Sequence, residues 1–130
     1  MKAGKKGKRK GSKNERKIAT EFKEWWGKGE WARTPLSGGW SSKSVREGFR
    51  TCGDIITTAE DFPFCVEGKH QEGWELIQLL SNPKSILYKF WGQAVTQTPS
   101  GLIPLLVVHR NYRESLVITR ESVFCGTVLE

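Results

Sequence analysis

Two stretches of the chain carry apolar side chains at the three- and four-residue spacing that is typical of an amphipathic helix. The first begins near Ser12, where Ser12 and Glu15 match the Ser-x-x-Glu pattern of a capping box, and it ends at Gly27 and Gly29. Its apolar positions are Ile18, Ala19, Phe22, Trp25 and Trp26. The pattern predicts a helix that packs on the core through this stripe.

The second amphipathic stretch lies before Pro99. Asn82 and Pro83 fit an N-cap followed by proline at the first helical position. The stripe that follows consists of Ile86, Leu87, Phe90, Trp91, Ala94 and Val95. This pattern predicts a helix that stops before Pro99, and residues 74–80 predict a short helix or turn in front of it.

Apolar runs without helical spacing predict strands. Residues 31–33 form one short run, and residues 103–109 are nearly all apolar, which is typical of a central strand covered on both faces. Residues 115–119 predict a second strand of the same kind, and residues 121–130 are expected to be peripheral.

Residues 53–69 predict a β-hairpin with Glu60 and Asp61 at the centre of its turn. Antiparallel pairing about this turn places Asp54 opposite Glu67, and Lys69 shares their face because strand side chains alternate. Two carboxylates held close together repel each other, so such a pair generally binds a metal ion or a proton. The alternative is a cross-strand salt bridge at a solvated edge of the sheet.

The opposite face of this hairpin is apolar, with Ile55, Phe64 and Val66 beside the small Gly68. A glycine between Glu67 and Lys69 weakens a strand, unless it makes room for a helix packed behind the hairpin.

The order of these elements predicts a single α/β domain, with a mixed sheet of four or five strands flanked by helices. No apolar run approaches the roughly 20 residues of a membrane span, and we expect no membrane association. The three cysteines, Cys52, Cys65 and Cys125, are an odd number without a Cys-x-x-Cys pair, which indicates reduced thiols and a cytoplasmic protein. With two histidines in the chain, any metal should be bound by oxygen, which favours Mg²⁺ or Mn²⁺.

The net charge of +7 is concentrated at the start of the chain, where residues 1–17 hold nine Lys or Arg against Glu15. Residues 1–11 have few apolar side chains and predict a disordered basic arm that attracts nucleic acid without sequence preference. Its candidate DNA contacts are Lys5, Lys6, Lys8, Arg9 and Lys10. The alternative is a solubilising leader.

Residues 34–52 form a connection that is long for a small domain, and such loops are more often functional than idle. Ser37, followed by Gly38 and Gly39, offers a hydroxyl and exposed backbone amides that suit a phosphate. Basic residues in and beside this loop are further candidate DNA contacts: Arg33, Lys43, Arg46 and Arg50.

With these motifs placed, residues 12–119 resemble the PD-(D/E)XK nuclease superfamily, and within it the archaeal-type Holliday junction resolvases and small phage nucleases. Five motifs in the family's order carry the resemblance. They are Lys-Gly-Ser-Lys-Asn-Glu-Arg at residues 10–16, Ser37-Gly38-Gly39, Gly53-Asp54-Ile55, Val66-Glu67-Gly68-Lys69 as the Glu-x-Lys motif, and Gln93.

The resemblance implies a restriction endonuclease-like fold for residues 12–130 and metal-dependent hydrolysis of DNA. Asp54, Glu67 and the carbonyl of Gly68 would hold Mg²⁺ or Mn²⁺, and Glu15 would bind the metal directly or through water. Lys69 would orient the attacking water, and Ser37 and Gln93 would complete the site.

Resolvases act as dimers on branched DNA, so the resemblance implies a homodimer, for which residues 74–80 are a candidate face. The sequence leaves two alternatives open. One is a nuclease of flap, single-stranded or duplex DNA without junction preference, and the other is a DNA-binding module without catalysis.

Overall fold

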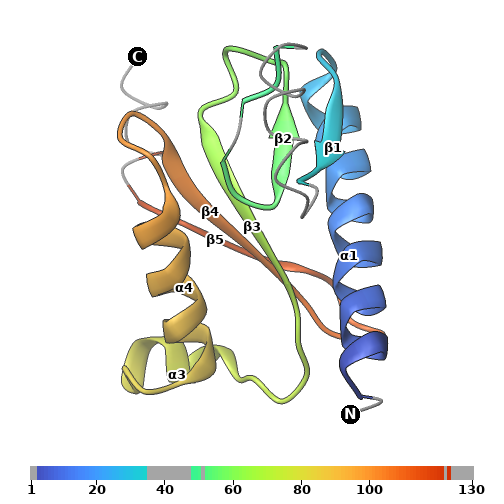
Figure 1. The fold of residues 1–130 in the computed structure, drawn as a ribbon. Coiled ribbons are helices and arrows are strands. Elements are labelled where there is room, and N and C mark those ends of the chain that lie inside the picture. The colour runs from blue at the N-terminus through green and yellow to red at the C-terminus, as the bar shows by residue number, and fades with distance from the viewer. Residues whose placement is uncertain (1–2, 35–47, 51, 122, 124–130) are drawn as a thin grey trace.

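The fold is a five-stranded mixed sheet with a long helix on one face and a shorter one on the other (Figure 1). A computed structural model describes residues 3–34, 48–50, 52–121 and 123, and for residues 3–10 it describes the backbone alone. The arrangement confirms the predicted α/β architecture. Within these residues, no helix is long and apolar enough to cross a membrane.

The five strands lie in the sheet in the order in which they occur along the chain. They are β1 (Trp31–Arg33), β2 (Ile55–Thr57), β3 (Phe64–His70), β4 (Ile103–His109) and β5 (Leu116–Thr119). Only β3 and β4 pair in parallel, because the chain crosses over between them through two helices. In the hairpin, Ile55 pairs with Val66, which is the register predicted from the acidic turn.

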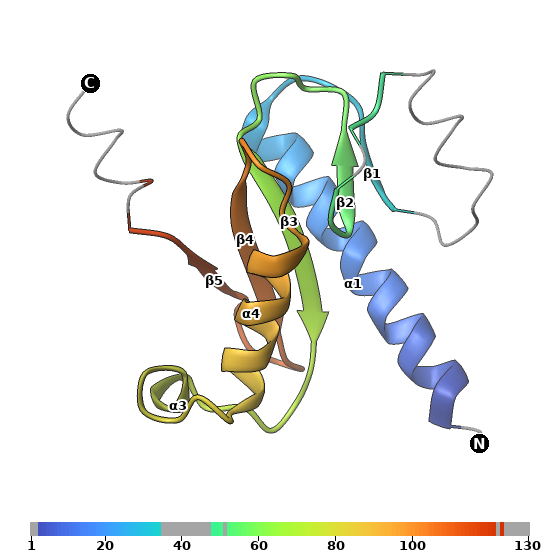
Figure 2. The same cartoon turned by 60° about the vertical axis from the view of Figure 1, so that its left-hand side comes forward.

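Helix α1 (Ala3–Trp26) covers the face of the sheet that the hairpin pattern marked as apolar. Ile18 and Ala19 are buried there against Ile55 and Val66 of the hairpin and Val107 of β4. Figure 2 shows α1 on the side of the sheet opposite to α4. The stripe predicted from the sequence is therefore the packing face of this helix.

Helix α4 (Ile86–Gln97) covers the other face, where Leu87 and Ala94 are buried against Leu106 and Val108 of β4. It ends before Pro99, as predicted. The short helix α3 (Leu76–Ser81) precedes it and buries none of its residues.

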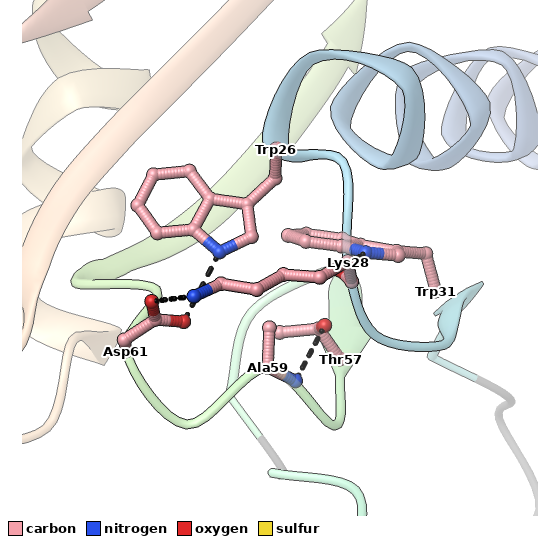
Figure 3. A network of polar contacts seen from close by, with 6 residues as sticks. All are labelled: Trp26, Lys28, Trp31, Thr57, Ala59 and Asp61. Atoms are coloured by element: carbon pink, nitrogen blue, oxygen red, sulfur yellow. Dashed lines mark hydrogen bonds and ion pairs between the residues drawn. The ribbon is translucent and has the colours of Figure 1, made fainter.

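A polar network ties the turn of the hairpin to the end of α1 (Figure 3). The indole Nε1 of Trp26 donates to Asp61 Oδ1 at 3.1 Å, and the ammonium group of Lys28 forms an ion pair with the same carboxylate. Within the turn, Ala59 N donates to Thr57 Oγ1 at 3.0 Å. These contacts fix the hairpin against the helix at one end of the sheet.

The start of α1 differs from the prediction. The helix begins at Ala3, so residues 3–11 are helical where we expected a disordered arm, and Ser12 lies within the helix and does not cap it. The Lys, Arg and Ala residues of this segment are good helix formers, whereas Gly4, Gly7 and Gly11 are poor ones. Once α1 is nucleated by the part that packs on the sheet, adding further turns costs little.

Two other local predictions were wrong. Helix α4 is capped by Ser85, whose side chain accepts from Tyr88 N, whereas the Asn82 side chain accepts from Lys84 N in a turn outside the helix. Strand β5 lies at the edge of the sheet and leaves Val117 55% exposed, so of these two predicted central strands β4 is covered on both faces and β5 is not. An apolar run alone does not distinguish an edge strand from a central one. Of residues 121–130, only Glu121 and Val123 lie among those described.

Candidate active site

Asp54, just before β2, lies beside Glu67 in the middle of the neighbouring strand β3. Asp54 precedes β2, its backbone N donates to the carbonyl of Val66 at 2.8 Å, and its Oδ2 accepts from Gly68 N at 2.9 Å. Gly53 makes this approach possible: its φ is +65°, and a Cβ there would lie 2.3 Å from the Val66 oxygen. The Asp54 side chain is thus held against the strand that carries Glu67.

Glu67 is almost fully enclosed, with 4% of its surface exposed. Burial raises its pKa to about 8, and the Asp54 carboxyl adds to the rise through its charge and through a hydrogen bond, while Lys69 opposes it. At neutral pH the pair therefore retains a proton. A divalent cation could replace that proton, since two neighbouring carboxylates are hard oxygen ligands.

Lys69 lies two residues beyond Glu67 on β3, and its ammonium nitrogen sits 5.1 Å from the centre of the Phe90 ring of α4. This cation–π contact fixes a long and flexible side chain beside the carboxylates. Phe90 was predicted only as part of an apolar stripe. The contact of Phe90 with Lys69 depends on how α4 crosses β3, and a local sequence pattern does not reveal that crossing.

Glu15 reaches the same region from α1. Its Oε2 accepts a hydrogen bond from Arg33 Nε at 3.0 Å, and both side chains are less than a quarter exposed. Burial raises the pKa of Glu15 and the charge of Asp54 raises it further, whereas Arg33 and Lys69 lower it. Glu15 therefore lies within electrostatic reach of the hairpin site and does not act as a helix cap.

Gly68 lies between Glu67 and Lys69 on β3 and faces α1, for which it makes room. A Cβ at this position would lie 2.8 Å from Ile18 Cδ1 and 3.8 Å from the side-chain nitrogen of Asn14. This confirms that the glycine makes room for a helix packed behind the hairpin.

Asn14 is a buried neighbour of this site that the sequence analysis overlooked. It is 5% exposed, and its Nδ2 has no hydrogen-bond partner within the described part of the chain. A polar residue four positions before Ile18, on the packing face of an amphipathic helix, was the available signal.

The donor set suits a hard divalent cation that prefers oxygen ligands better than a softer metal that prefers nitrogen or sulfur. Among the described residues, no group of three His, Cys, Asp or Glu side chains is arranged to hold a metal ion. Two carboxylates, from Asp54 and Glu67, stand together, and the third candidate, Glu15, is bound to Arg33. Oxygen ligands alone fit Mg²⁺ or Mn²⁺, with water or a phosphate completing the coordination.

The remaining predicted residues are less central. The guanidinium of Arg50 donates to the carbonyls of Phe62 and Phe64, between the hairpin turn and the start of β3, and so stabilises the fold. Gln93 is exposed on α4, and no contact joins its side chain to the carboxylates in the described structure. Several predicted positions lie outside the described residues: Ser37, Gly38, Lys43 and Arg46, together with the side chains of Lys5, Lys6, Lys8, Arg9 and Lys10.

Comparison with known proteins gives one match. Residues 6–128 match the model of a family described as "phage putative PDDEXK endonuclease". No curated protein and no solved structure matches the chain. The matched range includes Glu15, Asp54, Glu67 and Lys69.

Proposed function

The chain belongs to this family of phage PDDEXK endonucleases, and from that premise we propose that it is a divalent-metal-dependent DNA endonuclease. The observation that carries the proposal is the carboxylate pair of buried Glu67 and half-buried Asp54, with Lys69 two residues beyond Glu67 on the same face of β3. The raised pKa of Glu67, which Lys69 only partly offsets, marks a site that favours an additional positive charge. Phosphodiester hydrolysis requires such a charge where the attacked phosphate becomes more negative.

In this mechanism, Asp54, Glu67 and the carbonyl of Gly68 would hold Mg²⁺ or Mn²⁺, and Glu15 would bind the ion directly or through water. The ion would supply Lewis-acid polarisation of the scissile phosphate. Lys69, positioned by Phe90, donates a hydrogen bond to the attacking water and stabilises the charge that develops on the phosphate.

Nicking of supercoiled DNA in the presence of Mg²⁺ or Mn²⁺ tests this assignment. We expect Asp54→Ala, Glu67→Ala and Lys69→Ala each to lower the rate by roughly 10²-fold or more, because each removes a ligand or a proton-handling group. Lys84→Ala, an exposed position near α4, is the control and should cut like the wild type.

If all three site variants cut normally, the assigned site is wrong. If the wild type binds DNA but cuts no form of it with either metal, the chain is a DNA-binding module without catalysis.

We further propose branched or structured DNA as the preferred substrate. The support is the resemblance of five motifs, in order, to Holliday junction resolvases. A competition between a four-way junction and a linear duplex of the same sequence measures the preference. Equal affinity for the two would instead favour a nuclease of flap, single-stranded or duplex DNA.

A homodimer is the corresponding assembly, and α3 supports it by leaving Leu76 50%, Ile77 69% and Leu80 88% exposed. We also propose that the protein acts in the cytoplasm of the host cell. The free, buried thiols of Cys52 and Cys65 suit a reducing compartment. Cys125 lies outside the described residues.

A further inference from the structure

Helix α1 lies beside the edge strand β1 (Figures 1 and 2), and two hollows lie along this side of the helix. One hollow of about 430 Å³ is lined by Arg16, Ala19, Thr20, Lys23, Trp31, Ala32 and Arg33. A second hollow of about 460 Å³ is lined by Thr20, Lys23, Glu24, Gly27, Lys28 and Gly29. The two hollows adjoin each other, because Thr20 and Lys23 line both, and together they are called the groove below.

The lining of this groove is basic. It includes Arg16, Lys23, Lys28 and Arg33 against a single carboxylate, that of Glu24. The cations at the two ends have partners, since Lys28 pairs with Asp61 and Arg33 with Glu15. The two cations between them, Arg16 and Lys23, are exposed and form no ion pair with another described residue. They are therefore available to an anionic ligand.

The spacing of these two cations suits a chain of phosphates better than a single anion. Seven residues separate Arg16 from Lys23, which corresponds to about 10 Å along an α-helix. One strand of duplex DNA carries a phosphate about every 3.4 Å along the helix axis, so this distance spans roughly three nucleotide steps. Thr20 lies between the two cations on the same side of the helix.

The groove leads to the candidate active site. Its last lining residue, Arg33, binds Glu15, and Glu15 is within electrostatic reach of Asp54 and Lys69. Among the described residues, Arg33 uses only its Nε for this bond, which leaves the Nη hydrogens available for a phosphate. A backbone that follows the groove would thus arrive beside the carboxylate pair.

We propose that the groove between α1 and β1 binds the phosphate backbone of the DNA strand that enters the active site. This inference rests on the proposed nuclease function and adds a binding surface that was not predicted from the sequence, since neither Arg16 nor Lys23 was a candidate contact. A phosphate on the Nη hydrogens of Arg33 would leave the bond between Arg33 Nε and Glu15 intact, so the entering strand would lie beside Glu15.

The salt dependence of DNA binding tests the groove directly. The double variant Arg16→Gln with Lys23→Gln removes two cations while keeping good helix formers. Binding of labelled DNA is measured by fluorescence anisotropy in EDTA, which prevents cleavage, over a series of salt concentrations. Each lost phosphate contact should reduce the slope of log affinity against log salt by about 0.9 on duplex DNA, or about 0.7 on a single strand. For the two lost contacts, the slope should therefore decrease by about 1.8 on duplex DNA or about 1.4 on a single strand.

The matched control is Lys84→Gln with Lys89→Gln, which removes the same charge from exposed positions on the opposite face of the sheet. Its slope should stay close to that of the wild type. A groove variant whose slope matches the wild type, or a control that loses as much as the groove variant, overturns the inference. Circular dichroism confirms that both double variants are folded.

The outcomes separate this inference from the proposed function. If the wild type nicks DNA but the groove variant keeps its full salt dependence, the function stands and the groove assignment is wrong. If the slope of the groove variant falls by the expected amount but the wild type never cuts DNA, the groove assignment is supported and the proposed catalysis is wrong. If the wild type binds no form of DNA, both are wrong.

Discussion

At the scale of single residues, Glu67 has the most unusual environment of the site. It is almost fully buried, and its nearest carboxyl neighbour, Asp54, is fixed by backbone hydrogen bonds on both sides. The fold thus enforces a repulsion that a proton or a cation must relieve.

The stability of the metal-free protein should consequently fall as the pH rises. The pKa of Glu67 is about 8 in the folded state, against an ordinary value of 4.5. Below pH 4.5 the group is protonated in both states, and between about pH 4.5 and 8 the unfolded state gains stability by ionising. The expected loss is on the order of a few kcal/mol. Urea unfolding in EDTA at pH 5, 7 and 9 measures it.

Glu67→Gln mimics the protonated side chain, so the stability of the wild type relative to this variant should decrease across the same pH range. Glu60→Gln, at an exposed position in the hairpin turn, is the control and should leave the pH profile of the wild type intact. A constant difference between wild type and Glu67→Gln from pH 5 to 9 would show that Glu67 ionises normally.

At the scale of elements, the contact between α1 and β3 depends on Gly68. An added Cβ would lie 2.8 Å from Ile18 Cδ1. We expect Gly68→Ala to destabilise the fold by about 1–3 kcal/mol through overpacking. Gly92→Ala on α4 is a matched control, because no atom lies within 4 Å of the new Cβ, and it should stabilise the helix by about 0.5–1 kcal/mol. Thermal and urea unfolding measure both changes.

A third variant identifies the cause. Ile18→Val removes the methyl group that the new Cβ would meet, so combining it with Gly68→Ala should cost less than the sum of the two single changes. If the two changes are additive, the clash is relieved elsewhere and Gly68 is not required by α1.

The hairpin register was predictable because strand side chains alternate and one face is buried, so that a slip by one residue would expose Ile55 and Val66. The central strand β4 was predictable for a related reason, because a run of residues covered on both faces is apolar throughout. Both signals are local.

The supporting contacts of the site were not predictable in this way. Glu15 with Arg33, and Lys69 with Phe90, join elements whose crossing is set by tertiary packing. The start of α1 was missed for a different reason: a polar segment rich in lysine and glycine has no apolar periodicity, and its glycines disfavour a helix although its Lys and Arg residues favour one.

At the scale of the whole molecule, α1 combines two roles that we had assigned to separate segments. One side of it, with Ile18 and Ala19, forms the core, and another, with Arg16 and Lys23, lines the basic groove. The positive charge expected on a flexible arm is thereby carried on a helix of 24 residues. A DNA strand bound in the groove along α1 would therefore be held by the same helix that carries Glu15, close to Asp54 and Glu67.

The exposed apolar side chains of α3 lead to the last prediction. A proposed dimer that buries Ile77 and Leu80 should gain about 1.5–3 kcal/mol for each side chain. Replacing both by lysine should thus weaken dimerisation by at least about 10²-fold. Because both residues are exposed in the monomer, its fold should persist. Sedimentation velocity at several protein concentrations measures the change.

The control is Val117→Lys, which places a charge on another exposed apolar residue, at the edge strand β5. If this variant dissociates the dimer while the α3 variant does not, pairing occurs through the sheet edge and not through α3. If the wild type stays monomeric at every concentration and also when bound to a four-way junction, the dimer proposal is wrong. A single active site would then cut one strand at a time, which suits a nickase better than a resolvase.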